Sequence, residues 1–341
     1  MLVVAKPAGP TSHDVVALVR RLSATRRVGH GGTLDPFASG VLPVFLGRAT
    51  RLAEYHLGDR KGYTATICFG EGSTTDDLEG ERTPAEGPAP DRAAVEAALP
   101  RFVGEISQVP PAYSAVQVAG RRAYALARAG VTPELAPRTV TIHELRLVEW
   151  DASDPARPIA IVDVECSAGT YIRSLARDLG DALGNAAYLG ALARTRAGSF
   201  TVDDAVPLDT LREAANDGLE AVQRLLRPVD AGLERLPAAE IAETDVPRLA
   251  AGLPVRPVTP LDEATSGAPV VRVRVVDGPI VAIGHVDGGR IAPDKVLVDR
   301  WIGTDGITAQ AGTETATTDD ATEAATTDDA TEAAEAGATP A

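Results

Sequence analysis

One carboxylate stands inside an unusually glycine-rich stretch, Gly29 to Gly40, which holds four glycines in twelve residues. This acid is Asp35, and such a density of glycine indicates left-handed backbone angles or the close approach of a ligand. Pro36 biases Asp35 toward an extended conformation and lacks an amide donor, so we expect a rigid turn to present the side chain. Aspartates in such loops are more often turn or cap residues than catalytic acids. The rest of the chain must decide between a structural acid and a reacting one.

Catalytic signatures of other kinds do not occur in the sequence. There is no phosphate-binding P-loop, no Gly-x-Ser-x-Gly elbow and no His-Glu-x-x-His, and the glycine-rich stretch lacks the spacing of a dinucleotide fingerprint. The two cysteines, Cys68 and Cys166, do not stand at metal-ligand spacing. They are expected to be free, buried thiols in a reducing compartment, and a structural metal site is not expected.

The sequence predicts a cytoplasmic protein with no membrane association. No apolar run approaches the roughly 20 residues that a membrane span requires. The start, Met1 to Pro7, lacks the basic region and long apolar segment of a signal peptide and resembles a first strand instead.

Charge is distributed unevenly along the chain. The net charge is −15, but residues 304–341 carry nine acids and no Lys or Arg, and without them the net charge is −6. The first 63 residues carry nine basic and four acidic groups, a net charge of +5. Asp35 therefore lies in a locally basic segment that suits a polyanionic partner, although each arginine alone could equally belong to a solvated helix face.

The acidic C-terminal segment contains a nine-residue repeat, residues 316–324 followed by residues 325–333. The repeat has no side chain large enough to form a core, which excludes a solenoid. We expect a disordered, solubilising tail. A less favoured alternative is an electrostatic decoy for a basic surface.

Periodicity predicts a mixture of helices and strands. Helices are expected over residues 12–22 (capped by Ser12), 48–57 (ended by Gly58), 91–99, 121–128 and 170–183. Strands are expected over residues 41–46, 63–69, 112–118, 139–150, 159–166, 270–276, 280–286 and 295–298. Residues 70–90 are expected to form a loop, and residues 208–257 are rich in helix signals and prolines. Without steady strand–helix alternation, this pattern indicates an α+β fold.

Six separated motifs resemble one family, the bacterial tRNA pseudouridine-55 synthases (TruB). The motifs are Lys-Pro-x-Gly-x-Thr-Ser from residue 6, Gly-His-x-Gly-Thr-Leu-Asp-Pro from 29, Arg-Lys-Gly-Tyr from 60, Pro-Pro-x-Tyr-Ser-Ala from 110, Cys-Ser-Ala-Gly-Thr-Tyr-Ile-Arg-Ser-Leu-Ala-x-Asp-Leu-Gly from 166 and Leu-x-x-Leu-x-Arg-x-x-x-Gly from 189. They run in consistent order from about Leu2 to Phe200. Any one motif is weak, whereas six in register are highly specific.

The resemblance implies that Asp35 is the essential catalytic residue. The family's reaction detaches uracil from C1′ of a uridine, rotates it and rejoins it through C5. A carboxylate can attack C1′, add to C6 or remove the 2′ proton, and the sequence does not separate these routes. Each route needs an ionised acid in contact with the nucleotide while water is excluded, and none needs a metal or a redox cofactor.

The same resemblance implies roles for four side chains around the flipped base. Tyr63 would provide a stacking surface, Tyr171 would line the base pocket, and Arg173 would pair with Asp35. Leu192 matches a pocket-lining leucine. Without the resemblance, Tyr63 and Leu192 would be interpreted as core residues and Arg173 as a surface helix residue.

Further residues are implied to bind the RNA. His30 matches a histidine near the flipped nucleotide, with a loop histidine as the alternative, and Lys6 is either a phosphate contact or a structural lysine beneath the site. Phosphate contacts are expected from basic residues of the first helix and of a thumb-like insert at about residues 112–138: Arg20, Arg21, Arg121 and Arg122. Two departures from the family pattern, Gly31 in place of Thr or Ser and Gln117 in place of a frequent lysine, affect secondary RNA contacts.

The resemblance also implies an architecture and a partner. We expect a mixed, largely antiparallel sheet in a catalytic domain over residues 1–235, a small β-rich RNA-binding domain over 240–303 and the tail over 304–341. The expected partner is the T-stem loop of tRNA, bound by a monomer without a protein partner. The alternatives are a guide-RNA-dependent relative, a non-catalytic tRNA-binding or folding protein on the same fold and, more distantly, an acidic hydrolase.

Overall fold

The computed structural model describes residues 1–298 except 115, 119 and 132, and its largest feature is a ten-stranded mixed sheet. The main strand order is β14-β1-β3-β12-β4-β11-β10-β7, with β2 added beside β3 and β13 (Phe200–Thr201) beside β12. Only the β1–β14 and β3–β12 pairs of this sheet are parallel. The predicted α+β class with a largely antiparallel sheet is confirmed.

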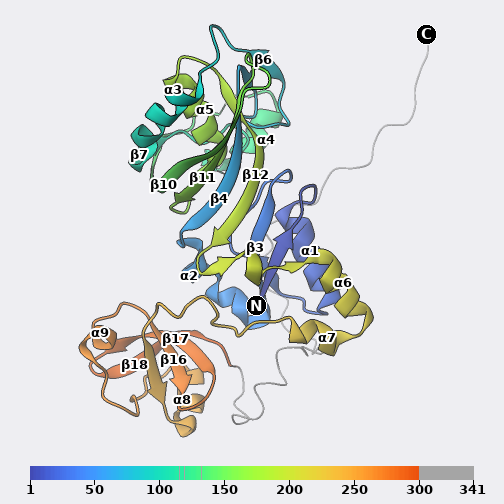
Figure 1. The fold of residues 1–341 in the computed structure, drawn as a ribbon. Helices are drawn as coiled ribbons and strands as arrows, with labels where there is room; N and C mark the ends of the chain where they lie inside the picture. The colour runs from blue at the N-terminus through green and yellow to red at the C-terminus, as the bar shows by residue number, and fades with distance from the viewer. Residues whose placement is uncertain (115, 119, 132, 299–341) are drawn as a thin grey trace, which may run out of the picture.

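The N-terminal part of the sheet, here called the small half-sheet, consists of β1 (Leu2–Lys6), β2 (Val28–His30), β3 (Ser39–Leu46) and β14 (Val206–Pro207). Its covering helices are α1 (Ser12–Leu22), α6 (Leu208–Asn216) and α7 (Leu219–Arg224) (Figure 1). Val15, Val19 and Leu211 from these helices pack on apolar strand residues in one buried cluster. Spacings of three and four residues place the valines of α1 on one face, which explains the helix.

The large half-sheet contains β12 (Ala187–Ala197), β4 (Lys61–Phe69), β11 (Ile159–Cys166), β10 (Arg138–Asp151) and β7 (Gly104–Gln108). Buried and partly exposed residues alternate along β11, as expected for a sheet with one covered face. That face carries α5 (Ile172–Ala182), whose Leu175 and Leu179 are fully buried, and α3 (Arg92–Ala98), which continues into a 3-10 turn over Leu99–Phe102. Strand β11 coincides with the prediction.

The two half-sheets meet between β12 and β3 through two residue pairs, Ala193 with Ser39 and Arg194 with Gly40. Gly40 has a φ of +110°, and a Cβ atom there would lie 2.1 Å from the carbonyl oxygen of Arg194. Only glycine allows this approach of the two backbones. Figure 1 shows β4 and β12 running from one lobe of the molecule to the other across this junction. Asp35 lies in the loop that immediately precedes β3.

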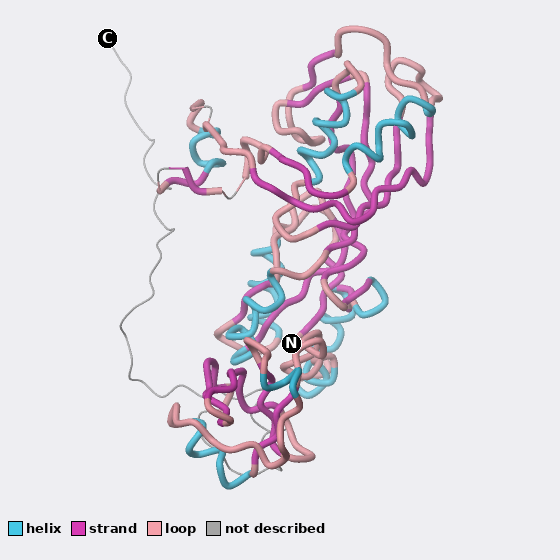
Figure 2. Tube along the Cα trace, turned by 90° about the vertical axis from the view of Figure 1, so that its left-hand side faces the viewer, coloured by secondary structure: helices cyan, strands magenta, loops and turns pink. Residues whose placement is uncertain are grey.

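A small insert projects from the large half-sheet. It contains β8 (Gln117–Val118), which pairs with β9 (Arg121–Arg122), and the short helix α4 (Ala123–Arg128). Figure 2 shows it extending sideways from the rest of the chain. The expected strand over 112–118 is therefore wrong in length, since only its last two residues form a strand.

A second sheet of four strands follows near the C-terminus: β15 (Ala238–Ile241), β16 (Val271–Val275), β17 (Ile280–Asp287) and β18 (Arg290–Val296). Helices α8 (Val246–Ala250) and α9 (Glu263–Ser266) accompany it. Leu297 packs with Leu52 in a shared cluster, and Arg48 Nη1 donates to the Leu297 carbonyl at 2.8 Å. The sheet thus rests on the turn Gly47–Leu52 and on α2 (Ala53–Leu57). The division at 235, 240 and 304 stays a prediction, and the tail lies outside the described residues.

Several sequence predictions need correction. Residues 48–57 split into a 3-10 turn and α2, residues 70–90 contain the paired strands β5 (Glu71–Ser73) and β6 (Arg82–Pro84), and the last strand covers 290–296 rather than 295–298. Strands β2, β7 and β12 were not predicted. No helix within residues 1–298, as far as they are described, is long and apolar enough to cross a membrane.

The cap of α1 also differs from the prediction. Thr11, not Ser12, is the N-cap: its hydroxyl accepts from the Asp14 amide, and the Asp14 carboxylate accepts from the Thr11 amide. The Ser12 side chain exchanges two hydrogen bonds with the backbone of Leu34 instead, at 2.8 and 3.0 Å. Ser12 therefore ties the first helix to the residue before Asp35.

Candidate active site

Two buried cations hold the loop that presents Asp35. From β1, Lys6 Nζ donates to the carbonyls of Pro7, Pro36 and Ala38 at 3.0, 3.1 and 2.6 Å. The lysine is 1% exposed, so its ammonium group is enclosed by the loop. This position favours the structural alternative for Lys6 over a phosphate contact.

The second cation, Arg194 of β12, is fully buried. Its Nε donates to the Val41 carbonyl at 2.7 Å, while Nη2 and Nη1 donate to the carbonyls of Gly32 and Thr33 at 3.1 and 3.4 Å. Neither Lys6 nor Arg194 forms an ion pair with a carboxylate in the part of the chain that the structure describes. Both ends of the Asp35 loop are thus fixed through backbone carbonyls.

Arg173 approaches Asp35 from the other side, from the first turn of α5. Its Nε lies 3.0 Å from Asp35 Oδ2, and its Nη2 donates to Oδ1 at 3.3 Å, which makes a two-point contact. Nη2 also donates to the Tyr113 carbonyl at 3.0 Å. The Arg173 side chain is 7% exposed, whereas that of Asp35 is 31% exposed, so the acid remains accessible from solvent. The sequence-predicted pairing of Asp35 with Arg173 is present in this geometry.

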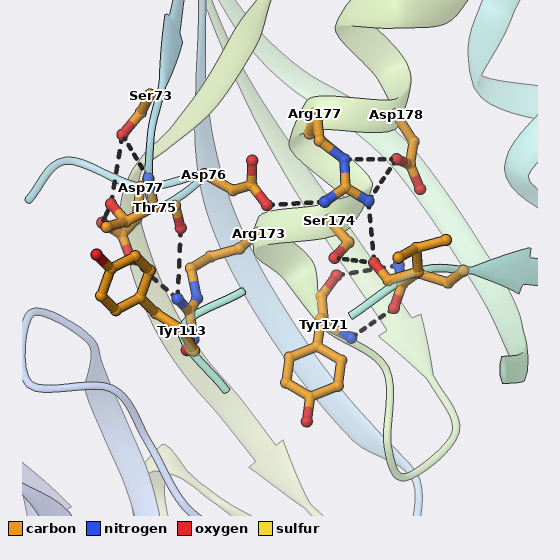
Figure 3. A network of polar contacts seen from close by, with 12 residues as sticks. Ser73, Thr75, Asp76, Asp77, Tyr113, Tyr171, Arg173, Ser174, Arg177 and Asp178 are labelled. Carbon is orange, nitrogen blue, oxygen red and sulfur yellow. Dashed lines mark hydrogen bonds and ion pairs between the residues drawn. The ribbon is translucent and has the colours of Figure 1, made fainter. Parts of the chain in front are cut away.

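A second carboxylate, that of Asp77, also forms an ion pair with Arg173. Asp77 Oδ2 lies 3.2 Å from Arg173 Nη1, and its Oδ1 accepts from the Thr75 hydroxyl and from the Glu79 amide. Arg177, one turn further along α5, pairs with Asp76 at 2.8 Å, which anchors the same segment (Figure 3). The sequence does not predict Asp77 as a site residue, because residues 70–90 have the composition of a loop and no local spacing relates Asp77 to a partner 96 residues away.

Burial raises the pKa of Asp35 above the usual value for aspartate. The positive charge of Arg173 opposes this rise, the negative charge of Asp77 adds to it, and Lys6 opposes it further. The carboxylate is therefore a stronger base than a solvated aspartate, yet it lies beside a guanidinium that favours its ionised form. A poised, ionised acid of this kind suits attack on carbon or removal of a proton.

Tyr63 of β4 lies directly opposite Arg194 on β12. It is 7% exposed and shares a buried cluster with Leu34 and Leu192, so the structure brings the predicted tyrosine and leucine together next to the Asp35 loop. Burial raises the pKa of Tyr63 to about 12, against the opposing effect of Arg194. Its hydroxyl is thus neutral at physiological pH and cannot serve there as a phenolate base.

Tyr171 is the N-cap residue of α5 and makes no side-chain capping bond. Figure 3 shows its ring pointing away from the Arg177–Asp178 pair, with its hydroxyl unconnected to the other residues drawn. Gln108 binds its backbone instead. The chain therefore places Tyr171 two residues before Arg173, on the same helix start that faces Asp35.

His30 lies at the end of β2, where its Nδ1 is buried and has no hydrogen-bond partner among the described residues. Burial lowers the pKa of His30, and the charges of Arg194 and His13 lower it further. A neutral imidazole is therefore expected. At the neighbouring Gly31, a Cβ atom would lie 3.0 Å from the Phe45 ring, so Phe45 would have to move to admit Thr or Ser.

The predicted phosphate-binding arginines lie on two separate parts of the molecule. Arg21 is exposed near the end of α1, and Arg20 Nε donates to the Arg26 carbonyl at 3.1 Å. Arg121 is exposed in the projecting insert, while the side chain of Arg122 lies outside what is described. Figure 1 shows α1 and α4 on different lobes, so these groups do not form one patch. In the described portion of the chain, no three His, Cys, Asp or Glu side chains are grouped so as to hold a metal ion.

Family comparisons agree with the motifs. Residues 20–172 match the model "TruB family pseudouridylate synthase (N terminal domain)", and residues 173–234 match "tRNA pseudouridylate synthase B C-terminal domain". A curated relative from Bradyrhizobium diazoefficiens, named tRNA pseudouridine synthase B, is 41% identical over 91% of this chain and 88% of its own. A relative of the same name from Thermobifida fusca is 54% identical over 62% of this chain and 73% of its own.

Among solved structures, the archaeal box H/ACA sRNP Nop10–Cbf5 complex contains a similar chain. It is 28% identical, with a TM-score of 0.65, over 87% of this chain and 86% of that one. The similarity therefore covers the large sheet as well as residues beyond the two family models, which end at residue 234.

Proposed function

This chain belongs to the TruB family of pseudouridylate synthases, and we propose that Asp35 is the residue on which its conversion of tRNA uridine to pseudouridine depends. The observation that carries this role is the two-point contact between Arg173 and Asp35 at 3.0 and 3.3 Å. A structural turn aspartate would not need a buried guanidinium that is itself fixed by a second carboxylate. The arrangement fixes a charged acid in one orientation while leaving it reachable.

The isomerisation breaks the bond between C1′ and N1 of uridine, rotates the uracil and forms a bond between C1′ and C5. Asp35 would act within contact distance of the extruded nucleotide, by attack on C1′, addition to C6 or removal of the 2′ proton. Every route requires the carboxylate to be held while the base turns. Lys6 and Arg194 fix the loop, and Arg173 fixes the side chain.

The base would be enclosed by aromatic and apolar side chains. We assign the floor of the pocket to Tyr63 and Leu192, which share the cluster beside the Asp35 loop, and one wall to Tyr171. His30, neutral and with an unpaired buried nitrogen, would contact the flipped nucleotide. Extrusion costs unpairing and unstacking energy, and an enclosed apolar site repays part of it.

The proposed target is the uridine at position 55 in the T-stem loop. Arg20 and Arg21 belong to α1, and Arg121 and Arg122 belong to the insert on the other lobe (Figure 1); one RNA loop would contact both groups. Such phosphate contacts give affinity and salt dependence rather than base choice. The exposed placement of Arg121 in a projecting insert supports a role as a thumb on the stem.

A guide-RNA-dependent activity is the second candidate, because the similar solved chain is part of a box H/ACA complex. The curated relatives at 41% and 54% identity are named for tRNA, which favours direct action on tRNA. We further propose a cytoplasmic monomer that needs no protein partner, as the resemblance to the family implies.

The deciding experiment incubates the full chain with an unmodified tRNA transcript and maps pseudouridine. Conversion of the T-loop uridine without any other RNA supports the proposal, and conversion only after addition of a guide RNA supports the second candidate. Asp35→Asn should abolish conversion while tRNA binding persists. Full activity of that variant would overturn the role of Asp35.

A further inference from the structure

Gln108, the last residue of β7, makes an unusual contact with the start of α5. Its side-chain amide is buried, Nε2 donates to the Tyr171 carbonyl at 3.0 Å, and Oε1 accepts from the Tyr171 amide at 2.8 Å. One side chain thus bonds both backbone polar groups of one residue; the carbonyl also accepts from the Leu175 amide at 3.1 Å, whereas the amide donates to Gln108. Gln108 belongs to none of the six family-like motifs of this sequence.

The contact matters because Tyr171 stands before the helix proper. Its φ of −100° and ψ of 111° are extended, so its amide has no partner within α5. Two hydrogen bonds on either side of one Cα atom fix the orientation of both adjoining peptide planes. They therefore fix the direction of the Cα–Cβ bond of Tyr171, which is the direction in which the side chain leaves the backbone.

Other contacts already attach α5 to the end of β7. The Ser174 hydroxyl donates to the Val109 carbonyl at 2.8 Å, and Arg177 Nη2 donates to the same oxygen at 2.9 Å (Figure 3). Arg173 is held separately by Asp35, Asp77 and the Tyr113 carbonyl. Loss of the Gln108 amide would leave the helix attached and Arg173 in place. It would release the Tyr171 amide, while the Leu175 amide would still donate to the Tyr171 carbonyl at 3.1 Å.

We propose that Gln108 is a positioning residue that orients Tyr171 over the flipped nucleotide; this inference rests on the proposed function. Gln108 does not touch the substrate but acts through Tyr171. Misplacing a group that lines a reacting base by a fraction of an ångström lowers the rate of the chemical step more than it lowers affinity for the whole tRNA.

The test compares single-turnover pseudouridine formation, with enzyme in excess over tRNA, in two variants. Gln108→Met keeps the length but removes both hydrogen bonds, and should slow the step by about tenfold or more while tRNA affinity changes less than about twofold. Gln108→Glu keeps an acceptor for the Tyr171 amide but faces the Tyr171 carbonyl with a charge. Once protonated it can donate to that carbonyl as the amide does, so its rate should recover relative to wild type as the pH falls from 8.5 to 6.

Ser174→Ala is the matched control, because Ser174 is fully buried and its hydroxyl donates to the carbonyl of Val109, the residue that follows β7, rather than to Tyr171. It should lose comparable stability and keep the wild-type rate. In a Tyr171→Ala background, Gln108→Met should add no further loss. Wild-type rates in both Gln108 variants, equal losses in Ser174→Ala, or additive losses in the double variant would each overturn the proposal.

Amide hydrogen exchange does not depend on catalysis, so it tests this inference separately from the proposed function. The Tyr171 amide should exchange its hydrogen faster in Gln108→Met than in wild type, while the amide of Leu179 within α5 stays protected. Unchanged exchange at Tyr171 would overturn the positioning role even if the enzyme is active. Absence of pseudouridine in wild type would instead refute the proposed function, and the exchange result would still decide whether Gln108 holds Tyr171.

Discussion

The two sides of the candidate site are held by opposite means. The Asp35 loop is fixed by cations, Lys6 and Arg194, which donate to backbone carbonyls and have no carboxylate partner among the described residues. On the facing side, Arg173 is fixed by two carboxylates, Asp35 and Asp77. The Asp35 loop is thus held through its backbone by two cations without a carboxylate partner, whereas on the facing side one guanidinium meets two carboxylates, an excess of negative charge.

This difference shows how the site holds the Asp35 carboxylate in one position and still keeps it reactive. Carbonyl oxygens stabilise a buried cation only partly, so the ammonium group of Lys6 still experiences the charge of Asp35. Burial lowers the pKa of Lys6, and the negative charge of Asp35 opposes that decrease. Asp35 is therefore shared between the two sides. The backbone contacts determine the position of Asp35, and burial together with the ionic contacts determines its protonation.

The largest effect is expected for Asp35→Asn, which removes the shared charge. Pseudouridine formation should fall by about 10⁴-fold or more, as for other essential catalytic acids. The pKa of Asp35 is raised in the folded protein, so its ionisation lowers stability progressively from the usual aspartate pKa up to the raised one. The stability of Asp35→Asn relative to wild type should hence grow as the pH rises from the usual aspartate pKa through the raised one. Urea unfolding at pH 3 to 8 measures this difference in stability. A variant that becomes less stable relative to wild type as the pH rises would contradict the raised pKa of Asp35.

Arg194→Met tests the Asp35 loop, which is held by cations that donate to its backbone carbonyls. It leaves the buried carbonyls of Gly32, Thr33 and Val41 without this donor, and should lower the free energy of unfolding by about 3 kcal/mol or more. Activity should fall by about a hundredfold because the loop loses its position. Arg194→Lys, which keeps the charge but not the three-way geometry, is the control. Equal rates for Lys and wild type would show that the charge of Arg194 matters and its shape does not.

Asp77→Asn tests the Arg173 side, where one guanidinium meets two carboxylates, and its expected effect is smaller. Arg173 keeps an oxygen acceptor, so the rate at neutral pH should fall by about tenfold. The charge of Asp77 raises the pKa of Asp35, and its removal should move the acidic limb of the pH–rate profile to lower pH. Asp76→Asn, next in sequence and paired with Arg177 instead, is the control for loosening of the segment. A shift of the limb toward higher pH would contradict this account.

Tyr63→Phe should have the smallest effect, a loss of about threefold or less, since the ring is kept. Because the pKa of Tyr63 is about 12, its hydroxyl stays protonated up to about pH 10, and the pH–rate profiles of variant and wild type should run parallel from pH 6 to 10. Tyr63→Leu, without the ring, should lose much more. An alkaline limb present in wild type and absent from Tyr63→Phe would show that the phenol takes part in proton transfer.

The sequence predicts the special backbone of the Asp35 loop better than it predicts the ion pairs of Arg173. Glycine and proline mark the Asp35 loop locally, so its special backbone can be recognised in twelve residues. Asp77 carries no such mark, because its partner is defined only after the sheet has formed. Strand β12 escaped prediction for a related reason: its buried Arg194 stands where a half-buried strand would carry an apolar residue, which breaks the usual alternation.

The narrow junction between β3 and β12 has a consequence for how the chain folds. Asp35 and Arg173 stand on opposite sides of a seam closed by two residue pairs, and 138 residues separate them. Contacts so distant in sequence form late, because closing a long loop costs chain entropy before the contacts stabilise it. Regained catalysis during refolding should therefore lag behind the return of secondary structure. An intermediate with both half-sheets formed but the seam open would look nearly native to circular dichroism and yet be inert toward RNA.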